Sequence, residues 1–227
     1  MFFVTAIVIA GNNLVMGQTR PATTPAEATR PTTGPDRPET AREAAPRQIV
    51  EQTVPLVTNL LLNRSLTPAQ KADCLQEIVN PRMDFPTLSR IMLGQAWDGL
   101  PQEQRGAFID VFVDYLMGVY VPLMNEYNGQ QVRVTEDSDV GRGDHLVTMR
   151  VTDLKGGSER QVALITCRLR QGEQGWKVID VIIEGVSVAR VFGSQFKPVL
   201  ARDGMDCLIK QLRDKIAHSK PVNESRR

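Results

Sequence analysis

Residues 161–186 read QVALITCRLRQGEQGWKVIDVIIEGV, and this stretch decides the fold. Apolar and polar side chains alternate on both sides of a short segment that contains Gly172 and Gly175. Alternation with a period of two is typical of a strand with one buried face, and a short glycine-containing connection favours an antiparallel hairpin. The stretch therefore predicts two neighbouring strands, at residues 161–170 and 176–186.

The same alternation precedes this hairpin at residues 146–152, and another candidate strand covers residues 131–136. Gly156 and Gly157 supply the turn before residue 161. Short turns between successive strands predict a four-stranded antiparallel meander. One face of this sheet is apolar, and it carries Val147, Met149, Val151, Ala163, Ile165, Cys167, Leu169, Ile179, Val181 and Ile183.

Helical periodicity dominates the chain before the sheet, from about residue 47 to residue 127, and returns at residues 188–200 and 206–217. These helices are expected to cover the apolar face of the sheet, because the opposite face is polar and charged. Helices on one face of an antiparallel sheet make an α+β fold. Alternation alone leaves two interpretations of the covered face open: an ordinary solid core and the lining of a cavity.

The N-terminal region differs from the rest in composition. The apolar run Phe2–Ala10 has the length of the hydrophobic part of a signal peptide and is too short to span a bilayer. No Lys or Arg precedes it, which a start codon placed too far downstream would explain. We predict a signal peptide at residues 1–17, a disordered Pro/Thr-rich tether at 18–46, a folded domain at 47–217 and a flexible tail at 218–227. A retained N-terminal anchor and a misread start are the alternatives.

Composition argues against several classes of function. The net charge of +1 argues against a nucleic-acid-binding protein, which normally carries a basic excess. Cys74, Cys167 and Cys207 form no CxxC pair and have no metal-ligand spacing with the two histidines. No nucleophile elbow, zincin motif, phosphate-binding loop or dinucleotide fingerprint is present. The sequence therefore predicts no catalytic residue, no metal and no cofactor.

One pair of carboxylates, Asp180 and Glu184, lies within the last predicted strand. The alternation places them on the polar face, where we expect ion pairs with Arg150 and Arg168 across the sheet. An alternative is a small enzyme with a similar cone-shaped fold, which would use Asp180 as a base in an apolar pocket. Ser187 is expected to cap the helix that follows it.

Three stretches form recognisable motifs: MDF…LSR…LG…W at residues 83–97, PQEQR…F…F at residues 101–112, and WKVIDV…EGVS with SQF at residues 176–196. Together they resemble the MlaC / toluene-tolerance family of periplasmic phospholipid-binding proteins. The resemblance extends from about Arg47 to Ala217, and the order and spacing of the three stretches make it specific.

This resemblance implies export to the periplasm, an NTF2/cystatin-like cone of helices on a sheet, and an apolar cavity for the acyl chains of a phospholipid. It also implies shuttling between an outer-membrane lipoprotein complex and an inner-membrane ABC transporter with an MCE-type substrate-binding subunit. We expect a monomer whose only ligand is its lipid cargo. A non-transporting envelope adaptor with a filled core remains the other non-enzymatic alternative.

The expected lipid-binding residues come from the apolar face of the sheet and from the helices that cover it. They are Val147, Met149, Val151, Ile165, Cys167, Leu169, Ile179, Val181, Ile183, Phe85, Phe108, Phe112, Leu116, Tyr120, Phe192 and Phe196.

The chain departs from the family pattern at one place. Val191, Phe192 and Gly193 stand where the family usually has Asn, Tyr and Arg. Loss of these polar side chains puts phosphate recognition in doubt and allows a less polar cargo, such as a hopanoid-like lipid.

Overall fold

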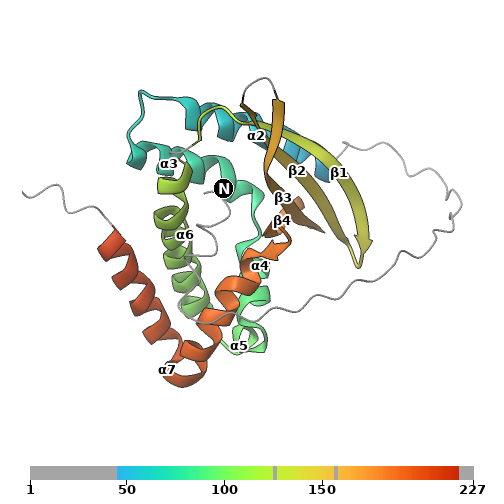
Figure 1. Ribbon diagram of the computed structural model, residues 1–227. Coiled ribbons are helices and arrows are strands. Elements are labelled where there is room, and N and C mark those ends of the chain that lie inside the picture. The colour runs from blue at the N-terminus through green and yellow to red at the C-terminus, as the bar shows by residue number, and fades with distance from the viewer. Residues whose placement is uncertain (1–44, 125–126, 156–157, 220–227) are drawn as a thin grey trace, which may run out of the picture.

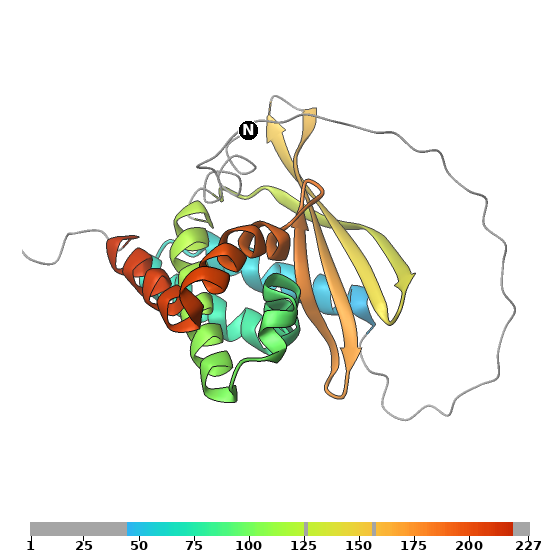
Figure 2. The ribbon, with the colours of Figure 1, turned by 90° about the horizontal axis from the view of Figure 1, so that it is seen from below.

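The computed structural model describes residues 45–124, 127–155 and 158–219. These residues form two layers, an antiparallel sheet and a group of helices that lie on one side of it (Figures 1 and 2). The α+β class predicted from the sequence is confirmed. The predicted signal peptide at 1–17 and nearly all of the predicted tether at 18–46 lie outside the described residues, as does most of the predicted tail at 218–227.

Five antiparallel strands follow one another in the sheet in chain order. They are β1 (Gln131–Gly141), β2 (Asp144–Lys155), β3 (Ser158–Gly172), β4 (Gly175–Ile183) and β5 (Val186–Ser187). Each strand pairs with the next, so the meander needs only short turns.

The predicted count of four strands is wrong because the last predicted strand folds back on itself. Glu184 and Gly185 both have positive φ, 50° and 80°, as the two central residues of a tight hairpin turn do. Val186 and Ser187 therefore return to pair with Ile183 and Ile182 as the short strand β5.

A β-bulge interrupts the alternation of β4. Arg168 pairs with Asp180 and the next residue, Leu169, pairs with Val178, so Ile179 has no partner on β3. The extra residue shifts the face on which Val178 lies relative to strict alternation. Val178 thereby joins the covered face of the sheet, which sequence periodicity did not predict.

The helical layer begins with α2 (Pro46–Leu62), which packs on β1 and β2. It continues through α3 (Pro68–Val79), η1 (Asn80–Arg82), α4 (Phe85–Leu93), α5 (Gln95–Asp98) and α6 (Gln102–Met124), and ends with α7 (Val188–Ser219). Side chains cap the starts of α3 and α4: Thr67 Oγ1 accepts from the Gln70 amide at 3.3 Å, and Asp84 Oδ1 accepts from the Thr87 amide at 2.9 Å. Gly204, with φ 80° and ψ 176°, breaks α7 between the two predicted C-terminal helices.

A compact aromatic cluster fills the space between α6 and α7. Phe108 and Phe112 stack with ring centroids 5.7 Å apart, and Phe192 and Phe196 stack at 5.6 Å. The two pairs meet edge to face, with Phe112 5.4 Å from Phe192. All four rings are 2% exposed or less. This cluster is therefore a solid core.

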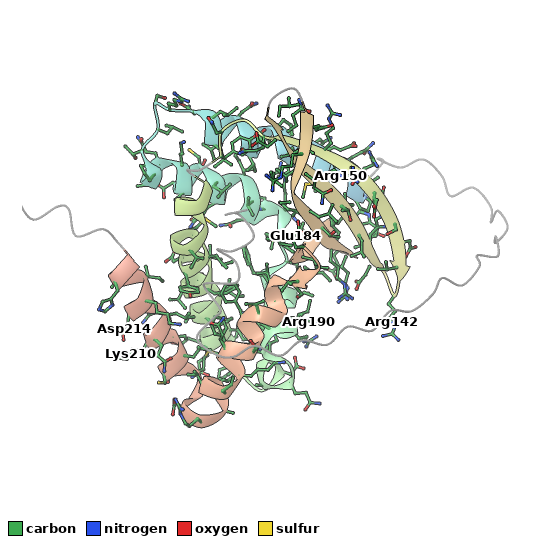
Figure 3. All side chains as sticks on the ribbon, in the orientation of Figure 1. Arg142, Arg150, Glu184, Arg190, Lys210 and Asp214 are labelled. Atoms are coloured by element: carbon green, nitrogen blue, oxygen red, sulfur yellow. The ribbon has the colours of Figure 1, made fainter. Side chains whose placement is uncertain are left out.

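The first residue of β2 anchors the far end of the sheet. Asp144 is 2% exposed and accepts hydrogen bonds from Arg168 Nε at 2.8 Å and from Arg170 Nε at 2.5 Å. Burial alone would raise the pKa of the Asp144 carboxyl, but the hydrogen bonds and charges of Arg170 and Arg168 hold it below its ordinary value. The carboxylate ties β2 to β3 beside the β1–β2 hairpin, whose tip carries Arg142 (Figure 3).

Candidate functional site

A cavity of about 280 Å³ lies between helix α2 and the covered face of the sheet. We call it the apolar cavity. The sheet contributes Val132, Met149, Val151, Ile165, Cys167, Val178 and Val181 to its lining, and the helical side contributes Ile49, Val50, Thr53, Val54, Val57, Thr58, Leu61, Val79, Arg82, Met83 and Tyr127.

The spacing of apolar residues along α2 explains why this helix closes the cavity. Val50, Val54, Val57 and Leu61 recur at intervals of three and four residues, so they lie along one face of the helix. The flank of this face carries Glu51, which forms an exposed ion pair with Arg47 at 2.7 Å. The helix therefore presents hydrocarbon to the covered face of the sheet, with the charged pair at the side of this stripe.

The polar lining residues of α2 have their hydroxyl groups bonded within the helix. Thr53 Oγ1 donates to the Ile49 carbonyl at 2.6 Å, and Thr58 Oγ1 donates to the Val54 carbonyl at 3.0 Å. Since each hydroxyl is turned back onto the backbone, the methyl groups of both threonines remain to line the cavity. Tyr127 likewise donates its hydroxyl to the Gln130 carbonyl at 2.7 Å.

Cys167 contributes a thiol to the sheet side of the cavity. It is a free cysteine, and burial raises the pKa of its thiol to about 12. At neutral pH the group is therefore a protonated, weakly polar thiol that behaves as a small apolar side chain. Arg82 is the one charged residue in the described lining, and one of its guanidinium N–H groups donates to the Ile78 carbonyl.

The predicted binding residues of the sheet divide into two groups. Those that line the apolar cavity are Met149, Val151, Ile165, Cys167 and Val181. Val147, Leu169 and Ile183 lie elsewhere on the covered face, and Ile179 is the unpaired residue of the bulge. Val147, Leu169 and Ile179 are fully buried, so packing against their neighbours leaves no open space beside them.

The structure places the predicted binding residues of the helices in the solid core. Phe85, Phe108, Phe112, Leu116, Phe192 and Phe196 all pack in the cluster between α4, α6 and α7, and none lines the apolar cavity. The side chain of Tyr120 lies outside the described part of the structure. The helix that faces the sheet across the cavity is α2, in place of the expected α6 and α7.

Sequence reasoning missed the contribution of α2 although its signal was present. An evident apolar stripe on α2 consists of Ile49, Val50, Val54, Val57 and Leu61. The stripe alone does not indicate whether these side chains line a cavity or fill a solid core. Val178 was hidden by the bulge, and Arg82, Met83 and Tyr127 lie in segments without periodicity.

The positions at which the chain departs from the family pattern lie away from the cavity. Phe192 is 2% exposed within the aromatic cluster, and Gly193 is buried against α4. Neither these two residues nor Val191 lines the apolar cavity. The inference that this departure weakens phosphate recognition is therefore not supported by the geometry.

Asp180 does not line the apolar cavity either, because its side chain bonds to residues at the start of α7. Its carboxylate, 3% exposed, accepts from Ser187 Oγ at 2.5 Å and from the Ala189 amide at 3.1 Å. Ser187 Oγ in turn accepts from the Arg190 amide at 3.1 Å, which confirms its predicted role as a helix cap. The predicted ion pair of Asp180 with Arg168 is wrong, because Arg168 bonds to Asp144. Asp180 thus holds the start of α7.

Within residues 45–124, 127–155 and 158–219, no group of three His, Cys, Asp or Glu side chains has the arrangement of a metal site. In the same residues, no helix combines the length and the apolar character needed to cross a bilayer.

Fold and cavity together define an α+β protein in which an antiparallel sheet and the helical layer, chiefly α2, line an apolar cavity. The chain belongs to the MlaC protein family, whose model matches residues 48–214.

Relatives with curated descriptions agree with this membership. The chain is 22% identical over 187 residues to the intermembrane phospholipid transport system binding protein MlaC of Haemophilus influenzae, covering 79% of this chain and 85% of that protein. It is 28% identical over 172 residues to the toluene tolerance protein ttg2D of Pseudomonas putida, covering 74% and 78%. The fold is also that of a phospholipid-binding protein from Ralstonia solanacearum, solved in complex with a phospholipid. That match has a TM-score of 0.66 and 23% identity, and it covers 76% of this chain and 97% of the other.

Proposed function

We propose that this protein is a periplasmic carrier that binds a phospholipid by its acyl chains and moves it between the outer and inner membranes. The observation that carries the proposal is the apolar cavity, whose threonine and tyrosine hydroxyl groups are bonded to backbone carbonyls. Burial of each methylene group contributes about 0.8 kcal/mol, so a lining of this kind favours long hydrocarbon chains. The described relatives, named for intermembrane phospholipid transport and for toluene tolerance, support the same function.

The size of the cavity bears on how cargo enters. A volume of about 280 Å³ is slightly below the usual range for ligand pockets, which measure roughly 300–1,000 Å³. A lipid with two long chains needs more space than this. We infer that α2 moves away from the sheet as the chains enter, because α2 forms most of the helical side of the cavity and is the first helix of the described domain.

The partners follow from the proposed role. A soluble carrier must receive lipid at one membrane and deliver it at the other, and we propose an outer-membrane lipoprotein complex and an inner-membrane ABC transporter with an MCE-type subunit as those sites. Location in the periplasm and export through a signal peptide are parts of the same proposal.

Mass spectrometry of lipid extracted from the purified protein tests the carrier function. We expect wild-type protein to carry phospholipid. Val57→Trp should lose that lipid and remain folded, because the indole occupies space that the cargo would fill, whereas overpacking of a solid core costs about 1–3 kcal/mol.

The matched control is Asn59→Trp, which adds the same side chain to an exposed position two residues further along α2. This variant should keep its lipid. Wild-type protein without extractable lipid, or equal lipid in the two variants, would contradict the proposal.

A further inference from the structure

A second hollow, of about 530 Å³, adjoins the apolar cavity on the side of α2 that faces the edge of the sheet. We call it the polar cavity. The two cavities share Val54, Thr58, Tyr127 and Val132 as lining residues. A ligand with one apolar and one polar part can therefore lie across these shared residues with a part in each cavity.

The lining of the polar cavity differs in chemistry from that of its neighbour. It includes Glu51 from α2 and Gln130, Gln131 and Arg133 from the start of β1. Because β1 is an edge strand, the hollow reaches both faces of the sheet. Val132 lies on the covered face and Arg133 on the opposite one. Arg133 is exposed and borders both this hollow and a second one on the outer face of the sheet.

The arginine beside this hollow has no acidic partner of its own. Arg133 donates to Gln131 Oε1 at 2.7 Å, and Arg150 on β2 is directly opposite it in the register. Within the described residues, neither arginine forms an ion pair with a carboxylate. Like charges at opposed positions on neighbouring strands are destabilising, and an anion bound near them relieves that repulsion. Arg150 is visible on the middle of the sheet in Figure 3.

The acidic groups nearby do not cancel this charge. Glu51 is paired with Arg47 at 2.7 Å, and Glu159, which borders the outer-face hollow shared by Arg133 and Arg150, accepts from Thr152 Oγ1 at 2.9 Å. At the start of β1, three guanidinium groups (Arg47, Arg133 and Arg150) thus lie with two carboxylates (Glu51 and Glu159), and the local balance is positive. The acidic residues of β1 lie further along the strand, from Glu136 on.

We propose that the polar cavity is the head-group site of the carrier and that Arg133 binds the phosphodiester of a diacyl glycerophospholipid. This inference rests on the proposed function, since it requires acyl chains in the adjoining apolar cavity. It goes beyond the proposed function by naming the hollow and the residue that recognise the phosphate of the cargo.

Two lipids with identical acyl chains, one with a phosphate and one without, distinguish the contribution of the head group to binding from that of the chains. Isothermal titration calorimetry would compare dioctanoyl phosphatidylglycerol with dioctanoyl glycerol, each added below its aggregation threshold to delipidated protein. Arg133→Gln should weaken binding of the phospholipid about three- to fivefold, as expected for a partly exposed charge pair, and leave binding of dioctanoyl glycerol unchanged. Arg150→Gln should weaken phospholipid binding by a smaller factor.

The matched control is Arg213→Gln, which removes the same charge from an exposed position on α7. That half of α7, where Lys210 and Asp214 are labelled in Figure 3, lies on the far side of the helical layer from the sheet. Phospholipid affinity should match that of the wild type.

The possible results are distinguishable. Equal losses for both lipids in Arg133→Gln, or no loss for either, would overturn the head-group assignment while the carrier function stands. If wild-type protein binds neither lipid, the carrier function itself fails, and the head-group site fails with it.

Discussion

Gly193 of α7 lies so close to Met92 of α4 that a β-carbon at residue 193 would stand 2.6 Å from the Met92 carbonyl oxygen. Only glycine allows the two helices to approach this closely without a shift of the backbone. The residue that seemed to mark a lost polar contact with cargo is therefore a packing residue of the helical core.

Gly193→Ala should lower the free energy of unfolding by about 1–3 kcal/mol, because the added methyl group must push α4 and α7 apart. Gly106→Ala is the control, since that position on α6 has nothing within 4 Å of a β-carbon. This second change should be neutral or should stabilise the helix by up to about 1 kcal/mol. Urea denaturation measures both. Equal stability of the two variants would contradict the close contact.

The buried carboxylate of Asp144 should make stability depend on pH. Its folded pKa is lower than the unfolded value of about 3.9, so its contribution is present above about pH 4 and is lost as pH falls through the folded pKa. Asp144→Asn should therefore be less stable than wild type at pH 7, by about 1–2 kcal/mol after allowance for the partly exposed arginines. The difference should shrink below pH 4. Denaturation curves at several pH values test this, and a difference that grows toward low pH would show the opposite sign.

The thiol of Cys167 should report on its apolar surroundings. In a Cys74→Ser, Cys207→Ser background, labelling by a maleimide should rise about tenfold per pH unit from pH 7 to pH 10, without levelling off, because the raised pKa of about 12 keeps the thiolate scarce throughout. In urea the reaction should become fast and level off near pH 9, as for an ordinary thiol. A plateau near pH 9 in the folded protein would mean that the thiol is not desolvated.

Asp180 should matter for stability and not for cargo. Asp180→Ala leaves the Ser187 hydroxyl and the Ala189 amide without their acceptor, which should cost about 1–3 kcal/mol. Ser187→Ala should cost about 1 kcal/mol through loss of the helix cap. Lipid extracted from either variant should equal that of wild type. Folded Asp180→Ala protein that lacks lipid would point instead to a role in binding.

Sequence periodicity predicted most of the helices and strands correctly, but it did not predict which residues line the apolar cavity. Alternation predicted the strands and their covered face because burial on one side fixes the pattern of residues. It could not show the bulge at Ile179, which depends on pairing with β3, or the turn at Glu184, which a non-glycine residue adopts with positive φ. These two local departures account for the misplaced Val178 and for the fifth strand.

The sequence could not show which apolar residues line the cavity and which fill the core, and the reason is a different one. The stripe on α2 and the aromatic residues of α6 are equally apolar, and only tertiary packing decides which of them faces an empty space. Phe108 and Phe112 pack edge to face against aromatic rings of α7, whereas Val54 and Val57 face the sheet across the cavity. Large rings fill volume that small branched side chains leave open.

The aromatic cluster lies beside the apolar cavity and does not surround it. The side chains that pack α4, α6 and α7 together are thus largely distinct from those that contact the proposed cargo. Mutations at Val57 or Val151 can change the shape of the cavity while Phe112 and Phe196 still hold the helices together. Selection for a new lipid can therefore act on this protein one residue at a time, and we expect cavity positions to diverge faster among its descendants than the aromatic ones.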